Sequence, residues 1–381
     1  MRPRFKPKLG WQEFLCLFRP HSGSVRQFEK AFAVKFKACD AVAFPYGRAA
    51  QRTFLQAVGL KDSDVIMPAY TCSVVAHAIS LSQNKPVFVD INLQDYNMRL
   101  DMLEKAVTSE TRAVIATHTF GYAQDLDRLE DIVEKASTRF GHKIWLIQDC
   151  CHAFDAAWKG RQIGTSGDVA IYALNISKMM TSVFGGMLTF QDQALADKVR
   201  AMRDLNYKRA GWRKSCLRRL YLLAVFISFH PIMYALTWFL QKRTRLLDRF
   251  TKAFHLDEQI AFPPDHDVMM CDFEAAIGLV QLSKYDDIIT KRRSVAQYYD
   301  ENLLLEEGWV KPPIVDGATY SHYVVRVPDR QKTIDEYAKK SIELGELIQY
   351  SIPATKPYLD QSGSCPNAWI ASQQTVNFPV S

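Results

Sequence analysis

One stretch of the sequence, residues 143–190, constrains the fold of this chain more than any other. It contains three short apolar runs, at 143–149, 168–174 and 187–190. Short apolar runs of this kind are typical of buried strands in a parallel sheet. Asp149 ends the first run, and Ser177 and Lys178 follow the second. Because ligands bind where the strands of an α/β sheet end, we expect Asp149 and Lys178 to lie at one site.

Asp149 and Lys178 are the two groups that pyridoxal 5'-phosphate (PLP) requires of a protein. The cofactor needs a lysine that bonds to its aldehyde and an acid that faces its pyridine nitrogen. An ionised Asp149 would keep that nitrogen protonated, which makes the ring an electron sink. Lys178 would bond to the cofactor and then move a proton as base and acid. The alternative for Lys178 is a solvated surface lysine, but its place between two apolar runs argues against that.

The pattern Asp149-x-x-His152 and Ser177-Lys178, followed by a Gly-Gly pair at 185–186, resembles the DegT/DnrJ/EryC1/StrS family of PLP-dependent sugar aminotransferases. Further segments fall in the family's order: FEKAFAVKF at 28–36, GRAA at 47–50, VIMPAYT at 65–71, PVFVDI at 86–91, THTFG at 117–121 and EAAIGLVQL at 274–282. The resemblance implies an α/β fold, that of a fold-type-I PLP-dependent transferase. A large domain would hold a mostly parallel sheet of the seven-stranded type, and a smaller C-terminal α+β domain would follow.

The resemblance also implies a reaction. The chain would be a PLP-dependent aminotransferase (transaminase) that moves an amino group, with glutamate as donor, to a keto group of a nucleotide-activated deoxysugar. The pathway would be cell-surface polysaccharide or glycan biosynthesis, and the enzyme a homodimer with both active sites at its interface. Lys178 separates the chain from the family's dehydratase branch, which has histidine at this position. Two alternatives stay open: an aminotransferase for a lipid-linked or other non-nucleotide carbonyl, and a membrane-tethered, catalytically weak scaffold or binding protein.

A glycine turn that opens a helix, Gly47-Arg48-Ala49, is the candidate phosphate seat. The start of a helix leaves backbone amides without partners in that helix and carries a positive dipole end, which suits a phosphate. Family members usually have threonine or serine after this glycine, whereas this chain has Arg48. Its guanidinium could grip the phosphate through paired hydrogen bonds or pair with a surface carboxylate. We predict the phosphate role, with Asn175 and Ser177 as further cofactor contacts.

Other predicted cofactor contacts match the family only in part. His152 fits the family's glutamine or histidine beside the phenolic oxygen of the cofactor. Cys72 stands where an aromatic residue often stacks on the ring, and it offers less contact area. Ala173 replaces a phosphate-binding serine, and Asp267 aligns with an asparagine that reaches the partner's cofactor phosphate. A carboxylate beside a phosphate is unfavourable, so either the alignment slips there or Arg48 carries the phosphate largely alone.

Two residues near predicted strand ends have two interpretations each. Tyr70 is the aromatic residue nearest to Cys72, and it belongs either to the ring site or to the core. His118 follows a predicted strand at 112–116 and either lines the mouth of the active site or is a hydrogen-bonded structural residue.

A chain of 381 residues is longer than one hydrophobic core usually accommodates, so we predict two domains. We predict a basic amphipathic lead at 1–24, a large PLP-binding domain at 25–284 that contains an insert at 213–262, and a small C-terminal domain at 285–381. Eight cysteines without a CxxC pair suit a reducing cytosol. Because no cleavable signal peptide is visible, we predict a cytoplasmic enzyme, with the inner face of the membrane as an alternative location, and no metal site.

The predicted insert concentrates the basic charge of the chain. Residues 205–252 hold eleven Lys and Arg against one acid, a net charge of +10, so the rest of the +7 chain sums to −3. Within this segment, residues 220–240 are uncharged over a length that meets the requirement of a membrane span. Pro231 in mid-run favours a kinked or re-entrant pair of half-helices. Positive flanks favour a hairpin held at the cytoplasmic side.

Two interpretations of the insert stay open. It associates shallowly with a membrane through 213–252, or it packs as two apolar helices on the protein body or a dimer interface. A full span is the poorest option, because it would separate the C-terminal domain from its own active site. We expect no nucleic-acid binding, because the basic residues lack interleaved stacking aromatics. The lead has the same two interpretations: an interfacial anchor or a helix packed on the body.

Overall fold

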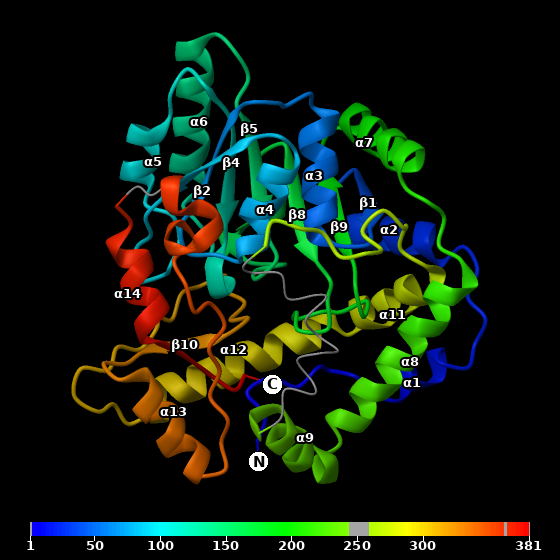
Figure 1. The fold of residues 1–381 in the computed structure, drawn as a ribbon, viewed down its shortest axis with the longest axis vertical. Coiled ribbons are helices and arrows are strands. Elements are labelled where there is room, and N and C mark those ends of the chain that lie inside the picture. Colours follow the sequence, from blue (N-terminus) through cyan, green and yellow to red (C-terminus); the bar gives the residue numbers. More distant parts are fainter. Residues whose placement is uncertain (1, 244–258, 362–363, 381) are drawn as a thin grey trace.

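The computed structural model describes residues 2–243, 259–361 and 364–380. Its centre is a seven-stranded sheet in the order β1-β9-β8-β5-β4-β2-β3 (Figure 1). The strands are β1 (Asp40–Phe44), β2 (Asp64–Pro68), β3 (Lys85–Val89), β4 (Thr111–Thr117), β5 (Trp145–Asp149), β8 (Val169–Ala173) and β9 (Gly186–Phe190). Only β9 in this sheet is antiparallel to its neighbours, β1 and β8. The mostly parallel sheet predicted from the sequence is confirmed.

Strand direction brings the predicted site residues to one edge of this sheet. Strands β1, β2, β4, β5 and β8 end at that edge, and the antiparallel β9 begins there. Gly47, Cys72 and Lys178 follow the ends of β1, β2 and β8, and Asp149 is the last residue of β5. Ligand sites of open α/β sheets form at such an edge.

Helices cover both faces of the sheet because its strands are apolar on both sides. In β1, Val42 and Phe44 pack into one core with α3 (Gly47–Ala57), whereas Ala41 and Ala43 pack into another with α2 (Ser24–Lys35). Burial on both faces is typical of parallel sheets. The other helices of this region are α4 (Ser73–Leu81), α5 (Leu100–Ala106), α6 (Leu126–Phe140), α7 (Gln193–Asn206) and α11 (Asp272–Ser283). Its short elements are β6 (Ala157–Trp158), β7 (Arg161–Gln162), η1 (Thr119–Gly121) and η2 (Ile163–Thr165).

The C-terminal part combines helices with a two-stranded antiparallel sheet of β10 and β11. Its elements are α12 (Tyr285–Asn302), β10 (Tyr323–Arg326), α13 (Arg330–Lys339), η3 (Ile352–Ala354), η4 (Lys356–Gln361), α14 (Pro366–Gln374) and β11 (Thr375–Phe378). Helices α12 and α13 and strand β10 lie below the main sheet in Figure 1, with α12 running across from α11. Helix α13 begins at Arg330 because Asp329 accepts a hydrogen bond from the Lys332 amide at 2.9 Å.

The lead and the insert form neighbouring helices, α1 (Trp11–Cys16), α8 (Trp212–Ser228) and α9 (Pro231–Arg243). The Phe14 ring of α1 meets the Phe226 ring of α8 edge-on at 5.6 Å. Glu13 is buried and pairs with Lys284 at 2.8 Å, so α1 packs on the protein body as one interpretation predicted. The predicted break near Pro231 is also confirmed, because α8 ends at Ser228 and α9 begins at the proline.

Membrane-spanning potential is limited to one bent pair. Within the described residues, no single helix is long and apolar enough to cross a bilayer. Helix α8 and residues Ile232–Phe239 meet the length and composition requirement only together, and they are bent by 90° at the break between them. This geometry agrees with the predicted pair of half-helices.

Three basic side chains of the insert, all on α8, face the protein. Lys214 donates to the carbonyls of Val268 and Met269 at 2.8 and 2.9 Å. Arg218 is buried in ion pairs. Arg219 donates to carbonyl oxygens at and after the end of α1, among them those of residues 16 and 19 at 2.9 and 3.0 Å. Spacing along α8 turns these three cations toward the protein, where backbone carbonyls and carboxylates satisfy them.

Candidate active site

The carboxylate of Asp149 lies at the end of β5, buried and held by two donors. Thr117, the last residue of β4, donates its hydroxyl to Oδ2 at 3.1 Å. The backbone amide of Cys151 donates to Oδ1 at 3.1 Å. The neighbouring strand and the following loop therefore fix the direction in which this carboxylate points.

His118, directly after β4, is a structural residue rather than part of the site. Its Nδ1 accepts a hydrogen bond from the Gln124 amide at 3.0 Å, and its Nε2 lies 2.8 Å from Oε1 of Gln148. Full burial lowers the pKa of His118 to about 4. Both ring nitrogens of this neutral histidine are occupied, which decides between the two predicted interpretations.

His152 is buried three residues after Asp149 and keeps one ring nitrogen without a partner. Its ring stacks on Phe120, with centroids 6.1 Å apart and planes 9° apart. Among the described residues, Nδ1 of His152 has no hydrogen-bond partner. Burial first, and then the positive charge of Lys178, hold the pKa of His152 well below its usual range. A buried, unpartnered nitrogen in a neutral ring is suited to a polar atom of a ligand.

Lys178 stands in the loop between β8 and β9, half-buried and next to His152. Its amide donates to the Asn175 carbonyl at 3.0 Å, and the Ser177 hydroxyl donates to Oδ1 of Asn175 at 3.0 Å. These two bonds form a compact turn that presents the lysine. Its ammonium acts on the pKa of both His152 and His322. The structure thus brings the Lys178 loop and the end of β5 together, as the sequence predicted.

His322 joins this site from the C-terminal part, and the sequence analysis missed it. Its ring lies 5.8 Å from the His152 ring. Burial first, and then the charges of Arg292 and Lys178, hold the pKa of His322 well below its usual range. The available signal was the polar pair Ser321-His322 immediately before an apolar strand.

Hydrogen bonds from distant segments hold His322 in place. Arg292 of α12 donates to the Ser321 carbonyl at 2.7 Å, and the Ser321 amide donates to the Phe120 carbonyl at 3.0 Å. Gly121 has a φ of 103°, and a Cβ there would lie 2.5 Å from the amide of Tyr320. Glycine is required for this close approach of the two segments.

The predicted phosphate seat lies at the same edge of the sheet. Helix α3 begins at Gly47, at the carboxyl end of β1. A Cβ on Gly47 would lie 3.2 Å from that of Ala173, and a Cβ on Gly186 would lie 2.5 Å from the Gly47 amide nitrogen. The turn therefore rests directly on β8 and β9. Ala49 is buried and donates its amide to the Tyr46 carbonyl at 3.1 Å, so it contributes packing to the turn.

These residues fit PLP on their own chemistry. A fixed carboxylate, an unpartnered buried ring nitrogen, a lysine and a helix start converge from separate strand ends. A sequence profile of the DegT/DnrJ/EryC1/StrS aminotransferase family matches residues 20–381. The chain belongs to this family. DegT/DnrJ/EryC1/StrS aminotransferases are PLP-dependent, and so is this enzyme.

Known DegT-family proteins resemble the chain over most of its length. It is 26% identical over 369 residues to spore coat polysaccharide biosynthesis protein SpsC of Bacillus subtilis (strain 168). This alignment covers 93% of this chain and 84% of SpsC. It is 27% identical over 281 residues to GDP-perosamine synthase of Escherichia coli O157:H7, across 73% of this chain and 63% of that protein. The sugar aminotransferase CalS13 from Micromonospora echinospora shares the fold, with a TM-score of 0.78, 20% identity and coverage of 100% and 95%.

The structure places the positions at which the chain differs from the usual DegT-family pattern. Cys72 is half-buried at the start of α4, at the carboxyl end of β2. Tyr70 is a core residue, since it is fully buried and its hydroxyl lies 3.0 Å from Oγ1 of Thr375. Asp267 pairs with Lys208 at 2.8 Å, and that hydrogen bond lowers the pKa of the carboxyl group. A neighbouring lysine thus offsets the negative charge at this position.

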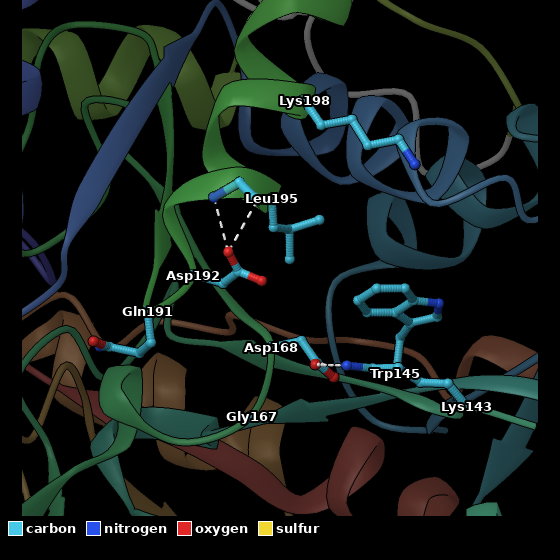
Figure 2. Close-up of a pocket in the computed structure, with 9 residues that line it drawn as sticks. Lys143, Trp145, Gly167, Asp168, Gln191, Asp192, Leu195 and Lys198 are labelled. Atoms are coloured by element: carbon cyan, nitrogen blue, oxygen red, sulfur yellow. Dashed lines mark hydrogen bonds and ion pairs between the residues drawn. The ribbon is translucent and has the colours of Figure 1, made fainter.

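One cavity lies at the other end of the sheet and is separate from this site. It has a volume of about 410 Å³. It is lined by Lys143, Trp145, Gly167, Asp168, Gln191, Asp192, Ala194, Leu195 and Lys198 (Figure 2). Trp145 begins β5 and Asp149 ends it, so the cavity and the carboxylate are about 13 Å apart along the strand. The Asp168–Lys143 ion pair, at 2.5 Å, crosses the lining.

Proposed function

We propose that this enzyme transfers an amino group from glutamate to a keto group of a nucleotide-activated deoxysugar, in cell-surface polysaccharide or glycan biosynthesis. The convergence of Asp149, His152 and Lys178 at one sheet edge is the observation that carries the aminotransferase site. The substrate class is supported by relatives named GDP-perosamine synthase and dTDP-4-dehydro-2,3,6-trideoxy-D-glucose 4-aminotransferase, the second from Saccharopolyspora spinosa at 25% identity over 320 residues.

The catalytic roles follow from the placement of these side chains. Bound PLP supplies an electron sink for the substrate's Cα. Asp149, oriented by Thr117 and the Cys151 amide, holds a proton on the ring nitrogen. Lys178 would take the proton from the Cα of the amino donor and would return it on the cofactor side. His152 offers Nδ1 to the phenolic oxygen.

The phosphate contacts come from the turn on β8 and β9. The first turn of α3, at Gly47 and Arg48, provides amides and a positive dipole end. The Arg48 guanidinium adds charge where Ala173 offers no hydroxyl group. Asn175 and Ser177 stand in the adjacent loop, on the Lys178 side.

An absorption titration with PLP tests the proposed site. Wild-type protein should gain a visible band that Lys178→Ala lacks, because only the lysine bonds to the cofactor's aldehyde. Lys198→Ala, which removes an exposed lysine at the other end of the sheet, should keep the band. Glutamate should then abolish the band, and a GDP- or dTDP-linked keto-deoxysugar should restore it.

Three outcomes would redirect this proposal. Restoration by a lipid-linked keto compound but by neither nucleotide sugar would favour the alternative substrate class, to which the apolar surface described below points. A band that no keto compound restores would reject the sugar reaction. The absence of any lysine-dependent band in wild-type protein would favour the scaffold alternative.

We also propose a homodimer, as the family resemblance implies, with the Lys208–Asp267 segment near the partner's cofactor phosphate. Light scattering after size exclusion should give twice the chain mass of 43.6 kDa. Lys208→Glu should weaken PLP binding if this segment reaches the second site, because it would place another negative charge beside a phosphate. A monomer that binds PLP with full affinity would reject this arrangement.

Association with an anionic membrane surface is a further proposal, carried by exposed large apolar side chains on the lead and the insert. In α8 and α9 the exposed large apolar side chains are Trp212, Leu217, Leu220, Leu223, Ile227, Ile232, Met233 and Phe239. On α8 several recur at helical spacing, which places them on one face. Trp11 and Phe18 of the lead are exposed as well, beside the Phe14–Phe226 contact.

Charge favours a bilayer over other occupants of this face. Glu13, the acid of the lead helix, is buried against Lys284. Among the described basic residues of the 205–252 segment, Arg209 and Arg213 are exposed, whereas Lys214, Arg218 and Arg219 bond to the protein. Arg213 is exposed and stacks over Trp212, with Cζ 5.6 Å from the ring centroid. Aromatic and aliphatic side chains with basic neighbours suit the interface of anionic lipids.

Vesicle flotation tests this membrane surface. Wild-type protein should float with phosphatidylcholine vesicles that contain phosphatidylglycerol, and binding should fall severalfold in high salt. The triple variant Leu220→Ser, Leu223→Ser, Ile227→Ser should lose most of the binding, because each residue would bury apolar area in the bilayer. Leu304→Ser, at an 88% exposed leucine of the C-terminal part, is the matched control and should bind normally. Failure of the wild type to float with these vesicles would reject the proposal.

A further inference from the structure

Helix α8 of the insert reaches the cofactor side of the molecule through one side chain, Arg218. Its guanidinium donates to Glu274 at 2.7 Å, to Asp265 at 2.6 Å and to the Tyr46 hydroxyl at 3.2 Å. It also lies over the ring of Phe184, with Cζ 4.2 Å from the centroid. Arg218 is only 7% exposed, so these bonds form in a region from which water is largely excluded.

Tyr46 connects this cluster to the phosphate seat because it is the residue immediately before α3. Its carbonyl oxygen accepts the amides of Ala49 and Ala50 at 3.1 and 3.0 Å, which forms the first turn of the helix. Its hydroxyl donates to Asp265 at 2.5 Å and accepts from Arg218. Tyr46 is therefore fixed at its backbone by the turn and at its side chain by the cluster.

The backbone of this residue has little freedom on its other side. A Cβ on Gly186 would lie 2.5 Å from the Tyr46 carbonyl carbon and 2.6 Å from its oxygen. The start of β9 thus supports the turn from one direction, and the Arg218 cluster holds the tyrosine from the other. Displacement of the tyrosine hydroxyl would change the direction of the α3 amides.

We propose that Arg218 is a positioning residue for the cofactor phosphate: through Tyr46 and Asp265 it sets the orientation of the α3 start. This inference rests on the proposed function, in which PLP binds at Gly47 and Arg48. It gives the insert two roles: Arg218 acts at the active site, and the exposed apolar side chains act at the outer surface. A purely structural role, in which Arg218 only neutralises the buried Glu274, is the competing explanation.

Two substitutions separate positioning from charge neutralisation. Tyr46→Phe removes the hydroxyl while it keeps the ring and the Arg218–Glu274 pair. Asp265→Ala removes the acceptor of the tyrosine hydroxyl and leaves the same pair intact. The matched control is Tyr221→Phe, which makes the same chemical change on α8, where the Tyr221 ring packs on Phe184 with centroids 4.9 Å apart.

The measurement is the PLP dissociation constant, obtained by absorption titration, together with the unfolding midpoint of the cofactor-free protein. We expect Tyr46→Phe and Asp265→Ala each to raise the dissociation constant about tenfold, since each breaks the hydrogen bond between the tyrosine hydroxyl and a charged group. Tyr221→Phe should leave it unchanged. The proposal is overturned if both variants bind PLP within twofold of wild type, whatever their unfolding midpoints. Wild-type protein without a Lys178-dependent band would instead reject the proposed function itself.

Discussion

Two buried histidines, His118 and His152, and the half-buried His322 lie at the ends of β4 and β5 or against them, and each is neutral at physiological pH. His118, His152 and His322 all have their pKa lowered, with burial as the largest cause. They therefore act as hydrogen-bonding and packing groups around Lys178 rather than as charges. His118 uses both of its ring nitrogens within the protein, whereas Nδ1 of His152 is available to a ligand.

The neutral His118 predicts a loss of stability in acid. Its pKa is about 4 in the folded protein against 6.5 for the free side chain, so below pH 6.5 the unfolded chain binds more protons. The contribution is present above pH 6.5 and is lost as the pH falls toward 4, by about 3 kcal/mol in total. Denaturant unfolding at pH 7 and pH 4.5 should show a smaller decrease for His118→Gln than for wild type. Equal decreases in the free energy of unfolding would contradict the conclusion that His118 is neutral in the folded protein.

The site residues that the sequence predicted share a local signal, and those it missed do not. Asp149 and Lys178 follow apolar runs, so strand-end reasoning finds them. His322 reaches the site through backbone bonds from residues 319 and 321 to residues 121 and 120, about two hundred positions away. Arg218 is separated from Glu274 by 56 positions. Contacts of this kind depend on tertiary packing, which composition and periodicity do not encode.

At the scale of elements, the antiparallel strand β9 has a specific task. It enters the sheet between β1 and β8, and its first residue, Gly186, lies against the Tyr46–Gly47 peptide. The sequence identified the Gly-Gly pair at 185–186 only by family resemblance. The structure supplies the physical reason for its second glycine, which is the close approach of the phosphate turn.

Gly186→Ala should therefore disturb the turn. The new methyl group would lie about 2.5 Å from Gly47 and Tyr46 backbone atoms, which must move to accommodate it. We expect a loss of 1–3 kcal/mol, roughly, in the free energy of unfolding, together with weaker PLP binding. The matched control is Gly211→Ala, because a Cβ at Gly211 meets nothing within 4 Å. Urea unfolding of both variants checks this, and equal stability would show that the turn can shift freely.

The element that sequence reasoning described least well is α8. Its apolar run and its end before Pro231 were predicted from the uncharged stretch and the proline. The inward direction of Lys214, Arg218 and Arg219 was not, because a run of basic residues usually marks a solvated face. The carbonyls and carboxylates that satisfy them belong to α11, to the loop before it and to the chain at and after the end of α1.

At the scale of the whole molecule, the C-terminal part is tied to the active-site edge. The amides of Thr319 and Ser321 bond to the carbonyls of Gly121 and Phe120 at 3.0 Å each. Tyr234 of α9 donates its hydroxyl to Glu343, which connects the insert to the same part of the chain. The domain boundaries at 24/25 and 284/285 stay predictions, since α12 begins at Tyr285 directly after α11.

Because His322 lies beside His152, PLP should stabilise the C-terminal part together with the large domain. At a PLP concentration one hundred times its dissociation constant, the expected gain is about 2.7 kcal/mol. The midpoint temperature of thermal unfolding should rise by the same amount whether it is followed by circular dichroism or by tryptophan fluorescence, and both should show a single transition. Trp309 and Trp369 report on the C-terminal part and Trp145 on the sheet. A fluorescence transition that PLP leaves in place would contradict this coupling.

The burial of Glu274 has a consequence for the history of this chain. Its side chain is 0% exposed, and its counter-charges, Arg218 at 2.7 Å and Lys214 at 3.8 Å, both lie on α8. Loss of that helix would leave a buried carboxylate without a counter-charge, at a cost of about 3–5 kcal/mol. A related chain could lack α8 only if position 274 were uncharged. One glutamate thus makes a helix obligatory, and a neutral residue at 274 should accompany its absence in related chains.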